Sequence, residues 1–374
     1  IFISVPFDWL FCDEYKPSFY LQSGGTTGKS KIVVLNDRAV NYQGENVAWI
    51  LGDQYRYCKG SGMLGFLPMF HGFGLAMGVH APLTNYATSD LMATYNEKEI
   101  GKLIKARKLR YLIVVPYLAK RMLKGKTLNN PSVSNLTHAF IGADKTNPTV
   151  FTEFDSIMEK NNSKCRLLEG YGLTETVTVV VVNRTFDRKP GSVGKPFPDV
   201  KLKVIDENGN TLSTNKNGQI CISAPCLALG YLNDKEATDK TFVTDENGIR
   251  WVLTGDEGYI DEDGFLFIKG RIKDMFKIAG FNIFPADIED MTNKIEGVEN
   301  CAAIYIDNPD HPYVHLFIKS DSKNIDTSEL VKRVRKILSN ELIKYAVPEK
   351  ITVIDKLPLT NVGKIDKKKL IELD

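Results

Sequence analysis

Hydrophobic and polar positions along the chain change their spacing twice, which divides the sequence into three stretches. Up to about residue 190, short aliphatic runs alternate with longer amphipathic segments. The runs at 64–67, 111–115 and 177–182 predict strands, and the segments at 97–108 and 149–160 predict helices. Strands that alternate with helices indicate an α/β layered fold.

The second stretch begins at about Gly191 and has the pattern of an antiparallel sheet. Short apolar runs are separated there by Asn-Gly and Asp-Gly pairs, at 208–209, 247–248 and 263–264. These pairs favour the tight turns of β-hairpins. We therefore expect residues 191–270 to be mainly antiparallel β.

The third stretch follows Arg271 and mixes helix and strand. Its predicted elements are a helix over 285–294, two strands within 302–320, an amphipathic helix over 329–342 and a strand over 350–355. The natural break lies at 270–274, so we expect a core domain of residues 1–272 and a smaller α+β domain of residues 273–374.

Composition and charge exclude several classes of protein. The 374 residues carry a formal net charge of +2, with basic and acidic residues interspersed, which argues against a nucleic-acid partner. No apolar run is long enough for a membrane span, and the opening segment lacks the basic residues of a signal peptide. Six scattered cysteines without histidines at metal-binding spacing favour a reducing, cytoplasmic location.

The segment SGGTTGKSK, residues 23–31, is the first candidate for chemistry. Small residues allow backbone N–H groups to converge on an anion, while hydroxyl groups and lysines add donors and charge. A P-loop would require glycine where Ser23 stands, and a helix where 31–35 predicts a strand. A loop between two strands therefore remains, either as a phosphate cradle or as a hairpin without a ligand. The candidate nucleotide-binding residues in this loop are Ser23, Gly24, Gly25, Thr26, Thr27, Gly28, Lys29 and Lys31.

Four further motifs follow this loop in order. They are GYGLTET at 170–176, TGDEGYIDEDG at 254–264, GRIKDMFKIAGFNIFPADIE at 270–289 and PLTNVGKID at 358–366. Each motif alone is weak evidence, but the ordered series covers nearly the whole chain. It resembles the adenylate-forming, or AMP-binding, superfamily of acyl-CoA synthetases, nonribosomal-peptide adenylation domains and luciferases.

The central motifs carry groups suited to a nucleotide. Tyr171 offers a flat face for a purine, Thr174 a hydroxyl for a phosphate, and Glu175 a hard carboxylate for Mg²⁺. Asp256 can accept hydrogen bonds from both ribose hydroxyls. The resemblance implies these roles, makes Thr174 and Glu175 catalytic, and gives Arg271 a further contact to ribose or phosphate. Without the resemblance, each would equally suit an ordinary turn. The resemblance also assigns to the nucleotide site Gly142, Ala143, Gly170 and Gly172.

Four more residues owe their roles to the resemblance alone. Lys364 stands in a lysine-rich tail that would otherwise be solvated surface, and the resemblance implies that it contacts the substrate carboxylate and the α-phosphate. Lys273 matches the hinge between the domains, and Gly280 matches the wall of the pantetheine tunnel of CoA. His71 matches a catalytic position beside the acyl pocket, although packing would equally explain a lone histidine there.

The resemblance implies a fold and a reaction. The fold would be a large multi-subdomain core of α/β layers plus a distorted antiparallel β-barrel, with a small mobile α+β C-terminal domain. The reaction would use ATP and Mg²⁺ to convert a carboxylic acid to acyl-AMP with release of pyrophosphate, and would then transfer the acyl group to CoA. The apolar segments FHGFGL and TVTVVVV favour a fatty or aryl acid.

Two other functions stay open at this point. The acceptor could be the phosphopantetheine of a separate carrier protein, or the chain could be a catalytically silent nucleotide-binding fragment. Gly24, Ser30 and Gln219 depart from the family pattern, but the first two preserve a flexible anion cradle. Only twenty-two residues precede the phosphate loop. We therefore expect the chain to lack the N-terminal region usual in the family.

Overall fold

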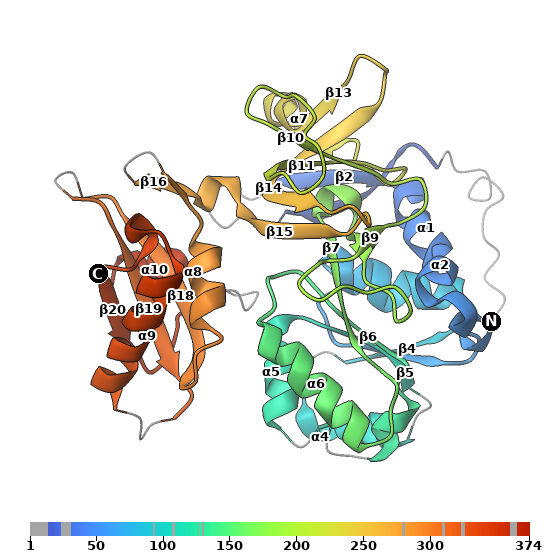
Figure 1. Cartoon of the computed structure of the whole chain (residues 1–374). Helices are drawn as coiled ribbons and strands as arrows, with labels where there is room; N and C mark the ends of the chain where they lie inside the picture. Colours follow the sequence, from blue (N-terminus) through green and yellow to red (C-terminus); the bar gives the residue numbers. More distant parts are fainter. Residues whose placement is uncertain are drawn as a thin grey trace.

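The computed structural model describes residues 14–23, 31–92, 94–106, 109–125, 127–128, 131–278, 281–308, 311–322, 326–359 and 365–374. Within these ranges the chain forms a larger unit and a smaller C-terminal unit beside it (Figure 1). Strand β15 (Leu266–Arg271) and the short 3₁₀ turn η6 (Ile272–Asp274) lead from one unit to the other.

The described strands of the larger unit include a seven-stranded mixed sheet with the order β4-β3-β5-β6-β7-β8-β9. Its strands are β3 (Gly62–Gly65), β4 (Thr88–Leu91), β5 (Leu109–Val114), β6 (His138–Ile141), β7 (Leu167–Gly172), β8 (Val179–Val182) and β9 (Lys195–Pro196). The strands from β4 to β7 are parallel, whereas β8 and β9 are antiparallel. The strands predicted from the aliphatic runs are thus confirmed.

Both faces of this sheet are buried, as expected for parallel strands. Leu112 and Val114 belong to a core shared with helices α4, α5 and α6, whereas Tyr111 and Ile113 belong to a core on the opposite face. The helices of the larger unit are α1 (Asp37–Glu45), α2 (Val47–Leu51), α3 (Ala81–Thr84), α4 (Glu97–Ala106), α5 (Pro116–Lys124), α6 (Pro148–Lys160) and α7 (Lys235–Thr241). Helix α6 begins after Asn147, whose side chain accepts a hydrogen bond from the Thr149 N–H.

Two antiparallel sheets complete the larger unit. One sheet contains β10 (Lys201–Ile205), β11 (Gly218–Ser223), β13 (Phe242–Thr244), β14 (Arg250–Ile260) and β15. The other contains β1 (Pro17–Gln22), β2 (Ile32–Asn36) and β12 (Gly230–Tyr231). Gly209, Gly248 and Gly264 have positive φ angles, as the predicted hairpin turns require. The long strand β14 pairs with β13 near its start and with β15 near its end. Among the described strands these sheets remain open, so the expected barrel is not closed.

The C-terminal unit has its own core. Its elements are the hairpin β16 (Phe276–Ile278) and β17 (Phe281–Ile283), the sheet β18 (Val298–Ile306), β19 (Tyr313–Ser320) and β20 (Lys350–Val353), and the helices α8 (Pro285–Thr292), α9 (Thr327–Glu341) and α10 (Lys367–Ile371). Leu330, Val334 and Leu338 follow one another on one face of α9 and are fully buried. The helices and strands predicted after Arg271 are confirmed.

Gly172, at the end of β7, allows a close approach of two backbone segments. A Cβ atom at this position would lie 1.7 Å from the Thr178 carbonyl oxygen. We expect Gly172→Ala to lower the free energy of unfolding by about 1–3 kcal/mol, because the backbone must shift to relieve the clash. Gly101→Ala in α4 is the control, since a Cβ there meets nothing within 4 Å and should stabilise the helix slightly. Chemical denaturation of both variants checks this; equal effects would contradict it.

Two further observations concern the environment of the chain. Over the residues that the structure describes, no helix is both long and apolar enough to cross a membrane. Five of the six cysteines lie in the described ranges, and all five are buried free thiols.

Candidate active site

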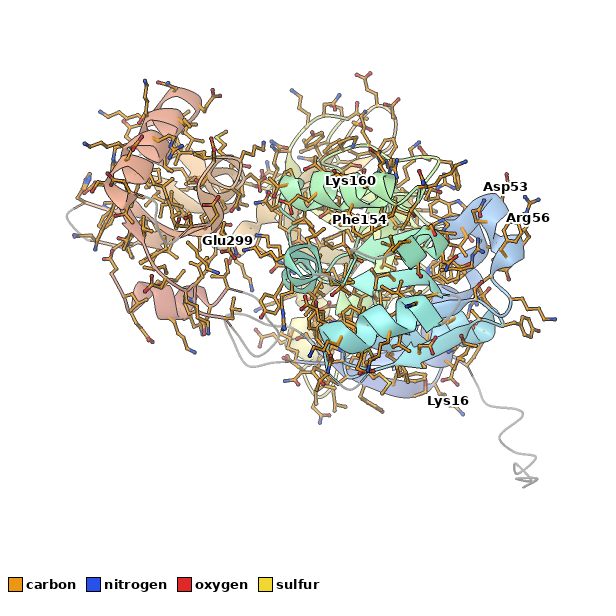
Figure 2. The ribbon with its side chains drawn as sticks, turned by 90° about the horizontal axis from the view of Figure 1, so that it is seen from below. Lys16, Asp53, Arg56, Phe154, Lys160 and Glu299 are labelled. Atoms are coloured by element: carbon orange, nitrogen blue, oxygen red, sulfur yellow. The ribbon has the colours of Figure 1, made fainter. Side chains whose placement is uncertain are left out.

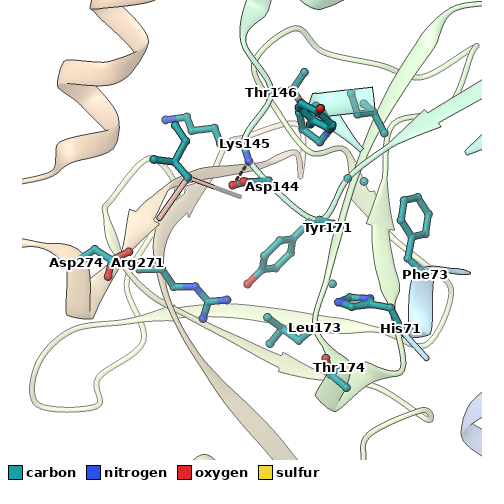
Figure 3. Close-up of a pocket in the computed structure, with 18 of the residues that line it drawn as sticks. His71, Phe73, Asp144, Lys145, Thr146, Tyr171, Leu173, Thr174, Arg271 and Asp274 are labelled. Carbon is teal, nitrogen blue, oxygen red and sulfur yellow. Dashed lines mark hydrogen bonds between the residues drawn. The ribbon is translucent and has the colours of Figure 1, made fainter. Parts of the chain in front are cut away.

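A cavity of about 1320 Å³ lies where the carboxyl ends of β6 and β7 meet the antiparallel sheets and the C-terminal unit. This edge of a parallel sheet is the usual place for a ligand site in an open α/β fold. Figure 3 shows Tyr171 in the middle of the cavity, with Thr174, His71 and Phe73 on one side of it and Arg271 on the other. The predicted site residues that line the cavity are Ser23, Lys31, His71, Gly142, Ala143, Gly170, Tyr171, Gly172, Thr174, Glu175, Arg271 and Lys273.

Several predicted residues lie outside the described part of the chain, namely Gly24, Gly25, Thr26, Thr27, Gly28, Lys29, Gly280 and Lys364. The segments next to two of these gaps are described. Strands β1 and β2 pair up to Gln22 and Ile32, and the Ser23 N–H donates to the Lys31 carbonyl oxygen at 2.8 Å. Residues 24–30, which lie outside the described residues, are thus flanked by two paired strands, and the flanking residues Ser23 and Lys31 both line the cavity. Leu359 and Ile365, on either side of 360–364, also line the cavity and form a β-bridge.

Tyr171, Asp256 and Arg271 form a hydrogen-bonded group, in which Tyr171 and Arg271 line the cavity, whereas the buried Asp256 is not among the lining residues. The Tyr171 hydroxyl donates to Oδ2 of Asp256 at 2.5 Å, and Nε of Arg271 lies 2.8 Å from Oδ1. Pairing of β14 with β15 places Asp256 opposite Arg271. Burial, together with the charge of Asp256, raises the pKa of Tyr171, so the phenol stays protonated. Both oxygens of the predicted ribose acceptor are thus engaged within the protein.

Glu175 lies on the 3₁₀ turn η5 (Thr174–Thr176), which directly follows β7. The Thr176 hydroxyl holds the turn. It accepts a hydrogen bond from the Leu173 N–H and lies within donating distance of the Leu173 and Thr178 carbonyl oxygens. Oε1 of Glu175 accepts a hydrogen bond from the Tyr231 hydroxyl at 2.6 Å. Tyr231 lies outside the recognised motifs, so the sequence did not single it out.

The residues present fit a Mg²⁺ ion that binds together with nucleotide phosphates. Mg²⁺ usually takes one or two protein carboxylates and completes its shell with water and substrate phosphates. Glu175 supplies such a carboxylate, held by a neutral donor, and Lys31 and Ser23 line the same cavity. Among the described residues, no group of three or more His, Cys, Asp or Glu side chains is arranged to hold a metal ion.

Part of the cavity lining is apolar and includes Ile50, Phe73, Met77, Phe140 and Val179. Figure 3 shows Phe73 close to His71. Gly72 lies against the backbone of Val177, where a Cβ atom would come within 1.8 Å of the carbonyl oxygen, and this close contact fixes the segment that carries His71. The arrangement suits an apolar group beside a polar reaction centre.

Polar contacts join the two units along one side of the cavity. Nζ of Lys145 lies 2.6 Å from Oδ2 of Asp290 in α8, and Nζ of Lys124 lies 2.8 Å from Oε1 of Glu299 in β18. Lys120 donates to the Glu299 carbonyl oxygen at 3.2 Å. Figure 2 shows Glu299 on the side of the C-terminal unit that faces the larger unit. These contacts hold the two units together beside the cavity.

Burial also changes the charge near this contact. It raises the pKa of Glu169 in β7 to about 7, although a hydrogen bond to Thr146 and the charge of Lys145 oppose the shift. Glu169 is therefore protonated for much of the time at neutral pH. Lys145 forms its ion pair with Asp290 instead.

Charge reversal tests whether the pair of Lys145 and Asp290 holds the two units together. We expect Lys145→Glu to lower the free energy of unfolding by up to about 1 kcal/mol, because a partly exposed pair contributes no more than that. Combining Lys145→Glu with Asp290→Lys should restore most of this loss, as measured by chemical denaturation. A double variant as unstable as the single one would contradict a role for this ion pair.

The chain matches two family models. The model for the AMP-binding enzyme covers residues 12–232, and the model for the AMP-binding enzyme C-terminal domain covers residues 287–364. The first match alone spans more than half of the chain.

Similar proteins include a luciferin 4-monooxygenase of Luciola mingrelica, 29% identical over 94% of this chain and 63% of its own length. A long-chain-fatty-acid–CoA ligase of Escherichia coli O157:H7 is 30% identical over 94% of this chain and 61% of its own length. Among solved structures, ATP-bound MatB from Rhodopseudomonas palustris superposes with a TM-score of 0.81 at 27% identity, over 95% of this chain and 67% of that one. The chain thus spans less than two thirds of the length of these two curated relatives.

Proposed function

Because this chain belongs to the AMP-binding enzyme family, we propose that it joins a carboxylic acid to the thiol of CoA through an acyl-adenylate. The observation that carries the proposal is the single cavity that contains Tyr171, Thr174, Glu175 and Arg271, with one end of the phosphate loop at Lys31. Charged side chains of both signs and apolar side chains line this cavity together. Such a site suits a reaction between a nucleotide and an apolar acid.

The first step activates the acid. A carboxylate oxygen attacks the α-phosphorus of ATP, the bond to pyrophosphate breaks, and a mixed anhydride of acid and AMP forms. Lys31 and the phosphate loop neutralise the leaving pyrophosphate, and Thr174 donates a hydrogen bond to the α-phosphate. Mg²⁺ would be held at Glu175 and would stabilise phosphate charge. Lys364 is assigned to the reacting oxygens, where negative charge builds up in the transition state.

Tyr171 and Asp256 are assigned to the nucleoside. The Tyr171 ring provides the face against which adenine stacks, and Gly142 and Ala143 leave room beside it. Asp256 can accept the ribose hydroxyls on the lone pairs that its contacts with Tyr171 and Arg271 leave open, or in exchange for the Tyr171 hydroxyl.

The second step transfers the acyl group to a thiol. The sulfur attacks the acyl carbon, and AMP leaves. We assign the hinge between the units to Lys273 in η6, place the boundary of the mobile C-terminal domain there, and assign the wall of the pantetheine tunnel to Gly280. CoA is favoured over a carrier-protein thiol because CoA ligases occur among the similar proteins.

The buried free thiols support a reducing compartment such as the cytoplasm.

The apolar lining beside His71 supports a fatty or aryl acid as the substrate class. Exchange of labelled pyrophosphate into ATP, measured with fatty acids, aryl acids and amino acids in turn, tests the proposal. Exchange that depends on an apolar acid and falls strongly in Glu175→Gln is the expected result. Binding of ATP without exchange for any acid would overturn it and would favour a silent nucleotide-binding chain.

A further inference from the structure

We propose that Tyr231 is a positioning residue that holds the Glu175 carboxylate and the Lys31 ammonium group apart and in fixed orientations, so that one can bind the metal ion and the other the phosphates. This inference rests on the proposed function of the cavity. It concerns a residue that none of the recognised motifs contains.

The backbone of Tyr231 is fixed on three sides. Strand β12 pairs with β2, which places Tyr231 opposite Val33, two residues from Lys31. The Tyr231 N–H donates to the Thr238 hydroxyl at 2.9 Å. Gly230 has a φ of 154°, and a Cβ atom there would lie 2.6 Å from Thr238, so this approach requires glycine.

The side chain of Tyr231 meets both charged groups. Its hydroxyl donates to Oε1 of Glu175 at 2.6 Å, and Nζ of Lys31 lies 4.4 Å from the centre of its ring. The ring also packs near Phe242, and the two ring centres lie 5.9 Å apart. One tyrosine thus bridges the turn that carries Glu175 and the end of the phosphate loop.

The chemistry of a phenol suits this position. A hydrogen bond from a neutral donor orients the carboxylate without cancelling its charge, and such partners of metal ligands tune metal affinity. The ring face attracts the ammonium group of Lys31 and holds it beside the site. Without the ring, Lys31 and Glu175 could form an ion pair with each other. Neither charge would then be available to bind the magnesium nucleotide. Two variants separate the effect of the hydroxyl from that of the ring. Tyr231→Phe removes the hydroxyl alone, and Tyr231→Leu removes the hydroxyl and the aromatic ring.

The test uses Mn²⁺ as a probe of the metal site. Binding of Mn²⁺ to the chain in the presence of ATP is measured by electron paramagnetic resonance. We expect Tyr231→Phe to weaken Mn²⁺ binding roughly tenfold and Tyr231→Leu to weaken it further. Thermal stability and metal-free binding of ATP to Tyr231→Phe should stay close to those of the parent chain. Tyr305→Phe is the matched control, because Tyr305 also hydrogen-bonds a carboxylate, that of Asp307, on the C-terminal unit.

A double-mutant cycle with Glu175→Gln makes the result specific. Once Glu175 is replaced, Tyr231→Phe should cause little further loss of Mn²⁺ affinity. Unchanged Mn²⁺ affinity in Tyr231→Phe, or equal losses in the presence and absence of the Glu175 carboxylate, would overturn the proposal. Because metal binding is read without turnover, failure of pyrophosphate exchange would contradict the proposed function and leave this result interpretable.

Discussion

Replacing Lys364 with alanine should slow acyl-AMP formation by roughly 10²- to 10³-fold, while ATP still binds. A lysine at the reacting oxygens contributes most when charge accumulates in the transition state, so its loss lowers the rate far more than the affinity. Lys364 itself lies outside the described residues, but Leu359 and Ile365 on either side of its segment line the cavity.

Lys369→Ala is the control for this experiment. Lys369 belongs to the same basic tail and is exposed on α10. Its Nζ lies 3.7 Å from Oδ2 of Asp366. Pyrophosphate exchange should fall in Lys364→Ala and stay near the parental rate in Lys369→Ala. Exchange at the parental rate in Lys364→Ala would remove Lys364 from the mechanism, and equal losses in both variants would point to a general effect of charge in the tail.

The second large effect concerns Asp256 and its partner Tyr171. We expect Asp256→Ala to weaken ATP binding by roughly 10- to 100-fold, because two hydrogen bonds to the ribose hydroxyls contribute about 0.5–1.5 kcal/mol each in net terms. Tyr171→Phe should act differently. It keeps the aromatic face but removes the hydroxyl that occupies Oδ2 of Asp256, so ATP binding should be unchanged or tighter.

Calorimetric titration of ATP into both variants measures these affinities. Both substitutions remove the same hydrogen bond of the free protein, the one between Tyr171 and Asp256. They should nevertheless alter ATP affinity in opposite directions or by very different amounts. Equal weakening by Tyr171→Phe and Asp256→Ala would show that the hydrogen bond between them matters for the fold of the site rather than for exchange with ribose.

Local signals explain why much of the fold was predictable. The β-branched residues after Lys31 predicted strand β2, and the glycine-rich loop before it was correctly placed between two strands. The buried face of α9 followed from the spacing of Leu330, Val334 and Leu338. In each case the pattern and the structure involve neighbouring residues, so the sequence carries the information directly.

Contacts between distant segments explain what was missed. Tyr231 meets Glu175 only because β12 pairs with β2, and the spacing of residues along the chain does not reveal that pairing. The ion pair of Lys145 with Asp290 likewise depends on how the C-terminal unit lies against the larger one. Asp256 stays a nucleotide candidate on its motif alone, and its hydrogen bond to Tyr171 depends on the register of β14 and the position of β7.

The most direct measurement of the central claim follows oxygen through the reaction. The chain is incubated with ATP, CoA and an apolar carboxylic acid labelled with ¹⁸O in its carboxyl group, and the AMP produced is analysed by mass spectrometry. Attack of the carboxylate on the α-phosphorus predicts one ¹⁸O atom in each AMP, together with an acyl-CoA product. Label found in inorganic phosphate, or AMP that forms without the acid and carries no label, would contradict adenylation of a carboxylate at this site.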